Sequence, residues 1–260
     1  MFRLSIHSVV PPLTDPRIVL QRADEVSAVF RMLSDAQTST LVLAGDPGAG
    51  KSTLAALLYR GLKMAAQAGQ VPIRHFVWLS LGPYATLPDV IAAILSEIRI
   101  AHASGAGPDP GIHEGIPDFF MQKPEEQIGL LRQTLSRPHE STLVVVDQFE
   151  ELLDDELAQG MVGRGALPLF LDMLQMELGA SRVLLTCRRS PFNTQNGANA
   201  RVRTNLVSRI SIPEGVALLQ QRGVQGMPEE LSLIWQRCAG HVFGLVLFSA
   251  LCALSGFSLS

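Results

Sequence analysis

Residues 45–52 read GDPGAGKS and match the phosphate-loop pattern GxxxxGK[ST]. Glycines let the main chain bring its N–H groups close to a phosphate, and a helix that begins directly after the loop adds the positive end of its dipole. Lys51 would supply a positive charge to the β- and γ-phosphates, the Ser52 hydroxyl would be a ligand of Mg²⁺, and Thr53 can reach the α-phosphate. The alternative is a glycine-rich turn that binds nothing, and the complete motif argues against it. The candidate nucleotide-binding residues of this motif are Gly45, Asp46, Pro47, Gly48, Ala49, Gly50, Lys51, Ser52 and Thr53.

A carboxylate that could complete a magnesium site follows a second apolar run. Four apolar residues at 143–146 precede Asp147, which therefore lies at the carboxyl end of a predicted strand. A phosphate loop needs an acidic residue on a neighbouring strand end to hold magnesium and its water ligands. We therefore predict that Asp147 and Ser52 together bind Mg²⁺.

Two glutamates close behind Asp147 are candidates for a general base. Hydrolysis of the γ-phosphate needs a carboxylate that accepts a proton from water, and Glu150 and Glu151 are both placed for this role. Gln148 occupies the position at which many ATPases carry the catalytic glutamate, so slow hydrolysis is expected. The acidic residues at 154–156 are interpreted as a solvated helix face and not as further ligands.

Arginines follow the fourth predicted strand. Arg188 and Arg189 come directly after residues 182–186, at the sheet edge where the phosphate loop is expected. A guanidinium there can bind the γ-phosphate and distinguish ATP from ADP; the alternative is a basic surface turn. Arg201 and Arg203 are predicted to face solvent or a neighbouring subunit. Because no aromatic residues alternate with these arginines, direct binding of nucleic acid is not expected.

The elements that must position these residues alternate between strands and helices. Short apolar runs predict strands at residues 39–44, 73–81, 142–146, 182–186 and 205–212. Apolar residues at helical spacing predict helices at residues 52–68, 87–100, 124–135 and 166–178. Three more predicted helices close the chain, at residues 213–222, 228–238 and 242–254. This order is typical of an α/β fold, in which a parallel sheet is covered by helices on both faces.

The same pattern predicts the domain organisation. A P-loop nucleotide-binding domain is expected at residues 1–212, interrupted by a glycine- and proline-rich loop insertion at residues 101–124. A small helical lid subdomain is expected at residues 213–260. With 47% hydrophobic and 17% charged residues, the 260-residue chain is composed like a globular protein and not like a disordered one.

Charge and cysteine content exclude further classes. The net charge of −3 argues against a uniformly basic nucleic-acid binder. Three cysteines without a CxxC pair point to a reducing compartment, and the N-terminus lacks the apolar core of a signal peptide, so a cytoplasmic protein is expected.

The uncharged stretch at residues 241–260 admits two interpretations. A membrane span needs about 20 predominantly apolar residues, whereas this stretch is interrupted by Gly244, Ser249, Ser255 and Gly256. A buried core helix is therefore favoured over a tail anchor, and no membrane contact is expected.

Taken together, these motifs resemble the signal-transduction ATPases with numerous domains (STAND), a class of P-loop NTPases, and in particular their NB-ARC-like branch and its bacterial relatives. The resemblance extends from about Pro16 to Leu254. It is carried by VLQR at 19–22 with DEV at 24–26, by DQFEEL at 147–152, by TCR at 186–188, and by the segments at 211–223 and 238–245. Gln21 departs from the glycine that is usual in the first of these motifs.

The resemblance implies several residue roles. Leu20 and Arg22 would contact the adenine side of the nucleotide, and Arg188 would bind the γ-phosphate in preference to Arg189. Val242 replaces the proline that packs on the adenine in the family. The class implies ATP/ADP and Mg²⁺ as cofactors, and self-association or a signalling protein as partner.

Two functions of different classes follow from these observations. The first is a nucleotide-dependent molecular switch with slow Mg²⁺-dependent ATP hydrolysis, which oligomerises in its ATP state. The second is a non-switching scaffold that holds ADP with little or no hydrolysis. A kinase or helicase-like enzyme is less favoured, because neither an arginine-rich lid after a helix nor an acceptor pocket is recognisable.

Overall fold

The computed structural model describes residues 6–8, 10, 22–105, 119–138, 141–153, 165–192 and 201–255. The strands are β1 (Ile6–His7), β2 (Thr40–Ala44), β3 (His75–Leu81), β4 (Thr142–Asp147), β5 (Arg182–Cys187) and β6 (Val202–Leu206). The helices are α1 (Ala23–Ser34), α2 (Lys51–Gln67), α3 (Leu87–Gly105), α4 (Pro124–Leu135), α6 (Ala166–Leu174), α7 (Ile212–Gln221), α8 (Pro228–Arg237) and α9 (Val242–Ser255), with a 3₁₀ turn η1 at Phe119–Met121.

The strands form a single six-stranded sheet in the order β1-β3-β4-β5-β2-β6. All neighbours from β3 to β6 run parallel, and β1 joins antiparallel at the edge beside β3. Every residue of β2 and β4 is buried, as expected of parallel strands covered on both faces. The predicted α/β P-loop fold with a parallel sheet is confirmed, with an antiparallel edge strand added to it.

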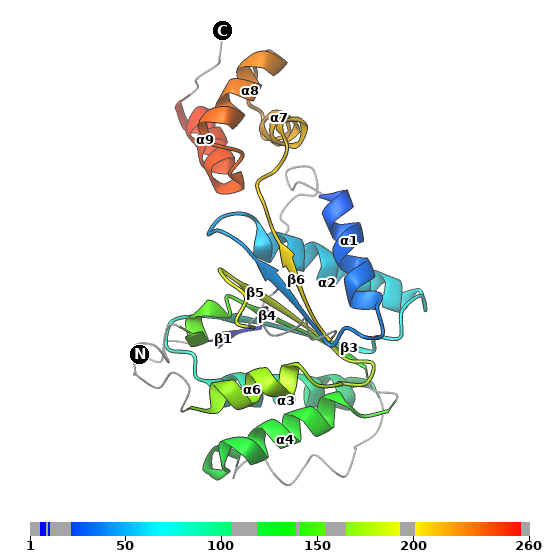
Figure 1. The fold of residues 1–260 in the computed structure, drawn as a ribbon. Coiled ribbons are helices and arrows are strands. Elements are labelled where there is room, and N and C mark those ends of the chain that lie inside the picture. The colour runs from blue at the N-terminus through cyan, green and yellow to red at the C-terminus, as the bar shows by residue number, and fades with distance from the viewer. Residues whose placement is uncertain are drawn as a thin grey trace.

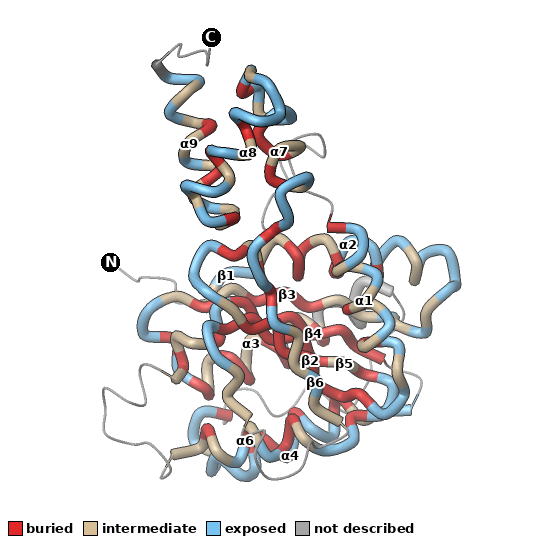
Figure 2. The backbone as a smooth tube through the Cα atoms, turned by 45° about the horizontal axis from the view of Figure 1, so that its top comes forward, coloured by how far each residue is buried: buried red, intermediate tan, exposed pale blue. Residues whose placement is uncertain are grey.

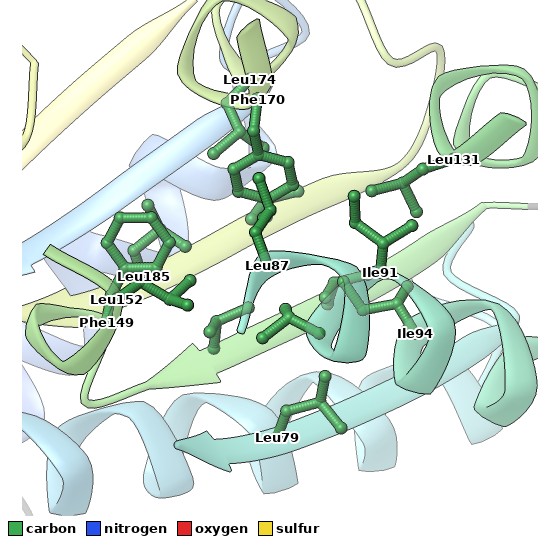
Figure 3. Packing of buried hydrophobic residues seen from close by; sticks show 14 of the residues in the cluster. Leu79, Leu87, Ile91, Ile94, Leu131, Phe149, Leu152, Phe170, Leu174 and Leu185 are labelled. Carbon is green, nitrogen blue, oxygen red and sulfur yellow. The ribbon is translucent and has the colours of Figure 1, made fainter. Parts of the chain in front are cut away.

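Helices cover both faces of this sheet (Figure 1). On one face α1 and α2 pack on the sheet, and on the other lie α3, α4 and α6. Alternate residues of β4 contribute to the two layers, because successive side chains of a strand point to opposite faces: Val145 packs with the helices α1 and α2, and Val144 with the others. Figure 3 shows the second of these cores, in which Phe149 lies near Phe170 of α6.

The last three helices form a separate unit with a core of their own, named here the three-helix unit (α7–α9). The buried hydrophobic residues of this core are Ile210, which precedes α7, and Leu218, Leu219, Val224, Leu231, Ile234 and Leu245. The unit stands above the carboxyl edge of the parallel strands, and residues 207–211, named here the connector, join it to β6 (Figures 1 and 2).

Helix α9 has apolar residues both on the side that faces the core of the three-helix unit and on the side that is exposed. Leu245 is buried in the three-helix unit, whereas Phe243, Leu247 and Leu251 are exposed. No helix within the described ranges is long and apolar enough to cross a membrane.

Some elements differ from the sequence prediction. The strand predicted at residues 205–212 lies instead at Val202–Leu206, where β6 pairs with β2. The apolar residues of the connector that suggested a strand are buried for other reasons: Val207 packs beside the P-loop, and Ile210 enters the core of the three-helix unit. β1 and α1 were not predicted.

Both ends of the range predicted as a loop insertion, residues 101–124, contain regular structure. Helix α3 continues to Gly105 through a stretch that contains two alanines, the best helix formers. The 3₁₀ turn begins at Phe119, whose side chain is buried. Residues 106–118 lie outside the described part of the chain.

Candidate functional site

The P-loop joins the central strand β2 to helix α2. Gly48 and Gly50 have φ of 78° and 93°, a left-handed conformation that glycine adopts without steric cost. A Cβ atom on Gly48 would lie 2.7 Å from the Cβ of Phe243 and 2.7 Å from Cε1 of His241. Glycine is therefore required at position 48 both for the turn and for the close approach of the segment that begins α9.

Lys51 is the first residue of α2, and the residue is only 8% exposed. Its ammonium group donates hydrogen bonds to the carbonyl oxygens of Gly45 (2.8 Å) and Asp46 (3.0 Å). The positive charge is thus held within the loop by main-chain oxygens. Where a phosphate is to bind, such an ammonium group can exchange these weak partners for an anion.

Ser52, Asp147 and Thr186 meet at the carboxyl ends of three strands. The Ser52 hydroxyl donates to Oδ1 of Asp147 at 2.8 Å, and the Thr186 hydroxyl donates to the same oxygen at 2.5 Å. Asp147 is 2% exposed. These two hydroxyls stabilise the buried carboxylate and orient it towards the start of α2.

The turn after β4 places Glu150, one of the two candidate bases, beside Arg188. Gln148 adopts a left-handed φ of 62°, and its N–H donates to the Thr186 hydroxyl at 3.0 Å. After this turn the Glu150 carboxylate faces Arg188, with 3.4 Å between Oε1 and Nε. The side chain of Glu150 is 15% exposed, and its Oε2 is buried without a hydrogen-bond partner within the described chain. The contact of Oε1 with Arg188 therefore places Glu150 near the end of β5 and leaves Oε2 able to accept a hydrogen bond, and we propose Glu150 over Glu151 as the base.

Cys187 ends β5 beside Glu150, and its environment suppresses thiolate formation. Burial, together with the negative charge of Glu150, raises the pKa of the Cys187 thiol to about 12 from 9.0. Since the thiolate is the reactive form, we expect iodoacetamide to modify Cys187 more slowly than the half-buried Cys238 and Cys252 in the native protein, as measured by peptide mass spectrometry.

The pH dependence of this thiol has a defined sign. The folded pKa lies above the unfolded value, so the protonated thiol contributes to stability below pH 9.0, and the contribution is lost as the pH rises towards about 12. Alkylation of Cys187 as fast as that of Cys252 at pH 8 would contradict this description of the strand end.

Arg22 precedes α1, and its side chain reaches the end of the P-loop that leads into α2. Its guanidinium donates to the Ala49 carbonyl at 2.8 Å and to the Ser208 carbonyl of the connector at 3.3 Å, and it is paired with Glu25. Leu20, the second residue expected on the adenine side, lies outside the described residues.

A cavity of about 280 Å³ opens between the P-loop, the connector and the turn before α9. It is lined by Asp46, Ala49, Val207, Ser208, Arg209, Gly240, His241 and Val242. The structure thus brings Val242 to the P-loop, next to the loop residues named from the sequence. A larger cavity, of about 470 Å³, lies at the amino ends of the parallel strands, around Phe30, Ile73 and Leu143. It is remote from the P-loop, which lies at their carboxyl ends.

The structure also reveals contributors that were absent from the candidate list. Thr186 binds Asp147, and Phe243 donates its N–H to the carbonyl of Gly48 at 3.2 Å. Thr186 could have been found from the sequence, since it ends a predicted strand beside the one that ends at Asp147. No sequence signal points to the contact of Phe243 with Gly48. Arg201 and Arg203, expected to face solvent or a subunit, form ion pairs with Glu177 and Asp35 respectively.

Comparison with known families shows the protein class to which this chain belongs. The model of the family Novel STAND NTPase 1 matches residues 14–212, which include the P-loop, Asp147 and Arg188. The chain belongs to the STAND NTPases. The class predicted from the sequence is therefore confirmed, whereas the NB-ARC-like branch within it stays a prediction. None of the curated proteins compared matches this STAND chain.

Solved structures share the fold at low sequence identity. A STAND protein with a tetratricopeptide repeat sensor from Pyrococcus horikoshii is 15% identical, over 85% of this chain and 28% of its own, with a TM-score of 0.49. The Aeropyrum pernix Orc1 protein in complex with DNA is 18% identical, over 96% of this chain and 65% of its own, with a TM-score of 0.57. The Hsp104–ADP complex of S. cerevisiae is 16% identical, over 95% of this chain and 40% of its own, with a TM-score of 0.52.

The STAND chain therefore spans between 28% and 65% of the length of these proteins. The likeness to Orc1 and Hsp104 establishes the P-loop ATPase fold. Family and fold together support a nucleotide-binding ATPase.

Proposed function

We propose that this STAND chain binds ATP and ADP at the P-loop and acts as a nucleotide-dependent molecular switch, with slow Mg²⁺-dependent hydrolysis. The observation that carries the proposal is the convergence of three groups at one sheet edge. The Lys51 ammonium group is held by loop carbonyls, and the Ser52 hydroxyl lies 2.8 Å from the Asp147 carboxylate. A cation and an oxygen-ligand pair side by side on a P-loop suit a nucleotide triphosphate with its metal ion.

The residues present fit magnesium. Ser52 and Asp147 offer adjacent oxygen atoms, which are the ligands that Mg²⁺ prefers. Mg²⁺ is commonly bound by one or two protein side chains together with phosphate oxygens and water. When bound, Mg²⁺ would neutralise charge on the β- and γ-phosphates.

The remaining roles follow from position. Lys51 would exchange its carbonyl partners for phosphate oxygens, and Glu150 would accept the proton of the attacking water. Arg188 lies on the same edge, paired with Glu150, and its side chain is 56% exposed, so its guanidinium could turn from this carboxylate to a γ-phosphate. Val242 lines the cavity beside the loop, where the base would lie. The division into a nucleotide-binding domain (residues 1–212) and a lid (residues 213–260) is part of this proposal.

Phosphate release and bound nucleotide distinguish the switch from the alternative scaffold. Turnover of ATP that requires Mg²⁺ would support the switch, whereas ADP retained through purification without turnover would support the scaffold. Failure of the purified chain to bind either nucleotide in a calorimetric titration would contradict both. Self-association in the ATP state is included in the switch hypothesis and would appear as a larger species in light scattering with a non-hydrolysable ATP analogue.

DNA binding is not included in the proposal. Orc1 is a DNA complex in its solved structure, but the likeness to this chain concerns the fold. Arg203 on the edge strand β6 and Arg201 directly before it are each paired with a carboxylate, so these two arginines do not present an unneutralised basic patch to a phosphate backbone.

Arg188 is expected to distinguish the two nucleotides. Arg188→Ala should weaken binding of ATP and spare ADP, because a guanidinium aimed at the γ-phosphate contributes only when that phosphate is present. A charge-assisted hydrogen bond of this kind contributes roughly 1.5–3 kcal/mol. Calorimetric affinities for both nucleotides test this, with Arg189→Ala as the matched control on the neighbouring exposed residue. Equal losses for ATP and ADP in the Arg188 variant would instead assign Arg188 a structural role.

A further inference from the structure

We propose that Arg22 is a positioning residue that ties the P-loop to the connector, so that nucleotide in the loop is sensed by the three-helix unit. The inference rests on the proposed function, because it requires that the P-loop bind a nucleotide. It differs from the role that the family resemblance implies, in which this arginine contacts the adenine side.

One guanidinium bonds the main chain of two segments that are far apart in sequence. Nη1 of Arg22 donates to the Ala49 carbonyl in the P-loop at 2.8 Å, and Nη2 donates to the Ser208 carbonyl in the connector at 3.3 Å. The side chain is only 3% exposed. Since the planar guanidinium holds its donors in a fixed fork, a movement of either carbonyl changes the geometry of the other bond.

Glu25 fixes the orientation of this fork. Its carboxylate accepts a hydrogen bond from Nη2 of Arg22 at 2.7 Å and lies against Nε. The charge of the buried arginine is thereby compensated on the face turned away from the P-loop. The ion pair with Glu25 therefore restricts the conformation of the Arg22 side chain, whose guanidinium links the two carbonyls.

Two main-chain hydrogen bonds join the same regions. The N–H of Val207 donates to the Ala44 carbonyl at the end of β2, at 2.7 Å, and the N–H of Phe243 donates to the Gly48 carbonyl. The connector is thus attached at the end of β2, and the three-helix unit is attached to the P-loop itself. Arg22 adds a link through a side chain, which can be removed by mutation while the main-chain bonds remain.

Beyond Ser208 the connector is bound to the three-helix unit through Trp235. The indole N–H of Trp235 donates to the Ile210 carbonyl at 3.0 Å, and the Ile210 N–H donates to the Gly240 carbonyl at 3.2 Å. The ring lies so close to Gly215 and Gly240 that Cβ atoms there would be 2.2 and 2.8 Å from it. Connector, α8 and the turn before α9 are therefore joined by hydrogen bonds and close packing, and we expect a shift of Ser208 to reach Trp235.

Trp235 provides the readout. The chain contains two tryptophans, so labelling with 5-fluorotryptophan gives two ¹⁹F NMR signals, which a Trp235→Phe variant assigns. Trp78 is buried in the sheet core and reports whether each variant is folded. In the wild-type chain we expect saturating ADP with Mg²⁺ to shift the Trp235 signal and to leave the Trp78 signal in place.

Arg22→Ala should lose most of the ADP-induced shift of Trp235 even when the loop is saturated with ADP. Arg22→Lys keeps the charge beside Glu25 but cannot reproduce the fork, so it should show the same loss and serves if the alanine variant unfolds. Arg31→Ala, on the exposed side of the same helix, is the matched control and should respond like the wild type.

The outcomes separate the two proposals. If both Arg22 variants show the wild-type Trp235 shift at saturation, or if ADP binds to the wild-type chain without moving Trp235, Arg22 does not couple the sites. A lowered affinity with an unchanged shift at saturation would make Arg22 a nucleotide contact only and would overturn the inference. If calorimetry detects no ADP binding to the wild-type chain, the proposed function itself fails.

Discussion

Lys51→Ala is expected to lower the affinity for ATP at least tenfold, a loss of ~1.4 kcal/mol or more. Within the described part of the chain the part-buried ammonium group bonds the carbonyls of Gly45 and Asp46 and no carboxylate, so its charge is available to an anion in the loop. Main-chain N–H groups alone cannot neutralise a γ-phosphate. Isothermal titration with ATP measures the loss directly.

The control for this substitution lies on the same helix. Lys63 is exposed on α2, and Lys63→Ala should bind ATP as the wild type does. Since Lys51 also holds two loop carbonyls, the melting temperature of the nucleotide-free variant should be recorded alongside. Unchanged ATP affinity in a folded Lys51→Ala variant would refute the P-loop assignment.

Asp147→Asn is expected to abolish ATP hydrolysis while leaving much of the ADP binding. The amide oxygen of asparagine can still accept hydrogen bonds from Ser52 and Thr186, so the strand ends should keep their arrangement. The negative charge that would hold Mg²⁺ is lost, whereas ADP is held chiefly by main-chain N–H groups and Lys51. A phosphate-release assay and an ADP titration on the same preparation measure both effects.

The matched control is Asp172→Asn, which changes an exposed carboxylate on α6 and should leave hydrolysis at the wild-type rate. The acidic residues at 154–156, interpreted from the sequence as a solvated face, lie outside the described residues. If the Asp147 and Asp172 variants hydrolysed ATP equally well, the placement of Asp147 at the metal site would be wrong.

The sequence alone determined those features that depend on residues close to one another along the chain. The spacing of glycines, Lys51 and Ser52 indicates a P-loop because the loop conformation and the helix that follows are local properties. The apolar run before Asp147 indicates a strand buried on both faces, and the structure shows β4 wholly buried. Since carboxyl ends of parallel strands meet at one edge, the proximity of Asp147 to the P-loop could also be predicted.

Only the tertiary structure decided the contacts between segments that are distant in the chain. Arg22 and Ser208 are 186 positions apart, and no local pattern relates them. Likewise, the apolar residues of the connector suggested a strand, because periodicity records that a side chain is buried and not what buries it. The close approach of Phe243 to Gly48 depends on how the three-helix unit sits on the P-loop, which is set by packing and not by the sequence of either segment.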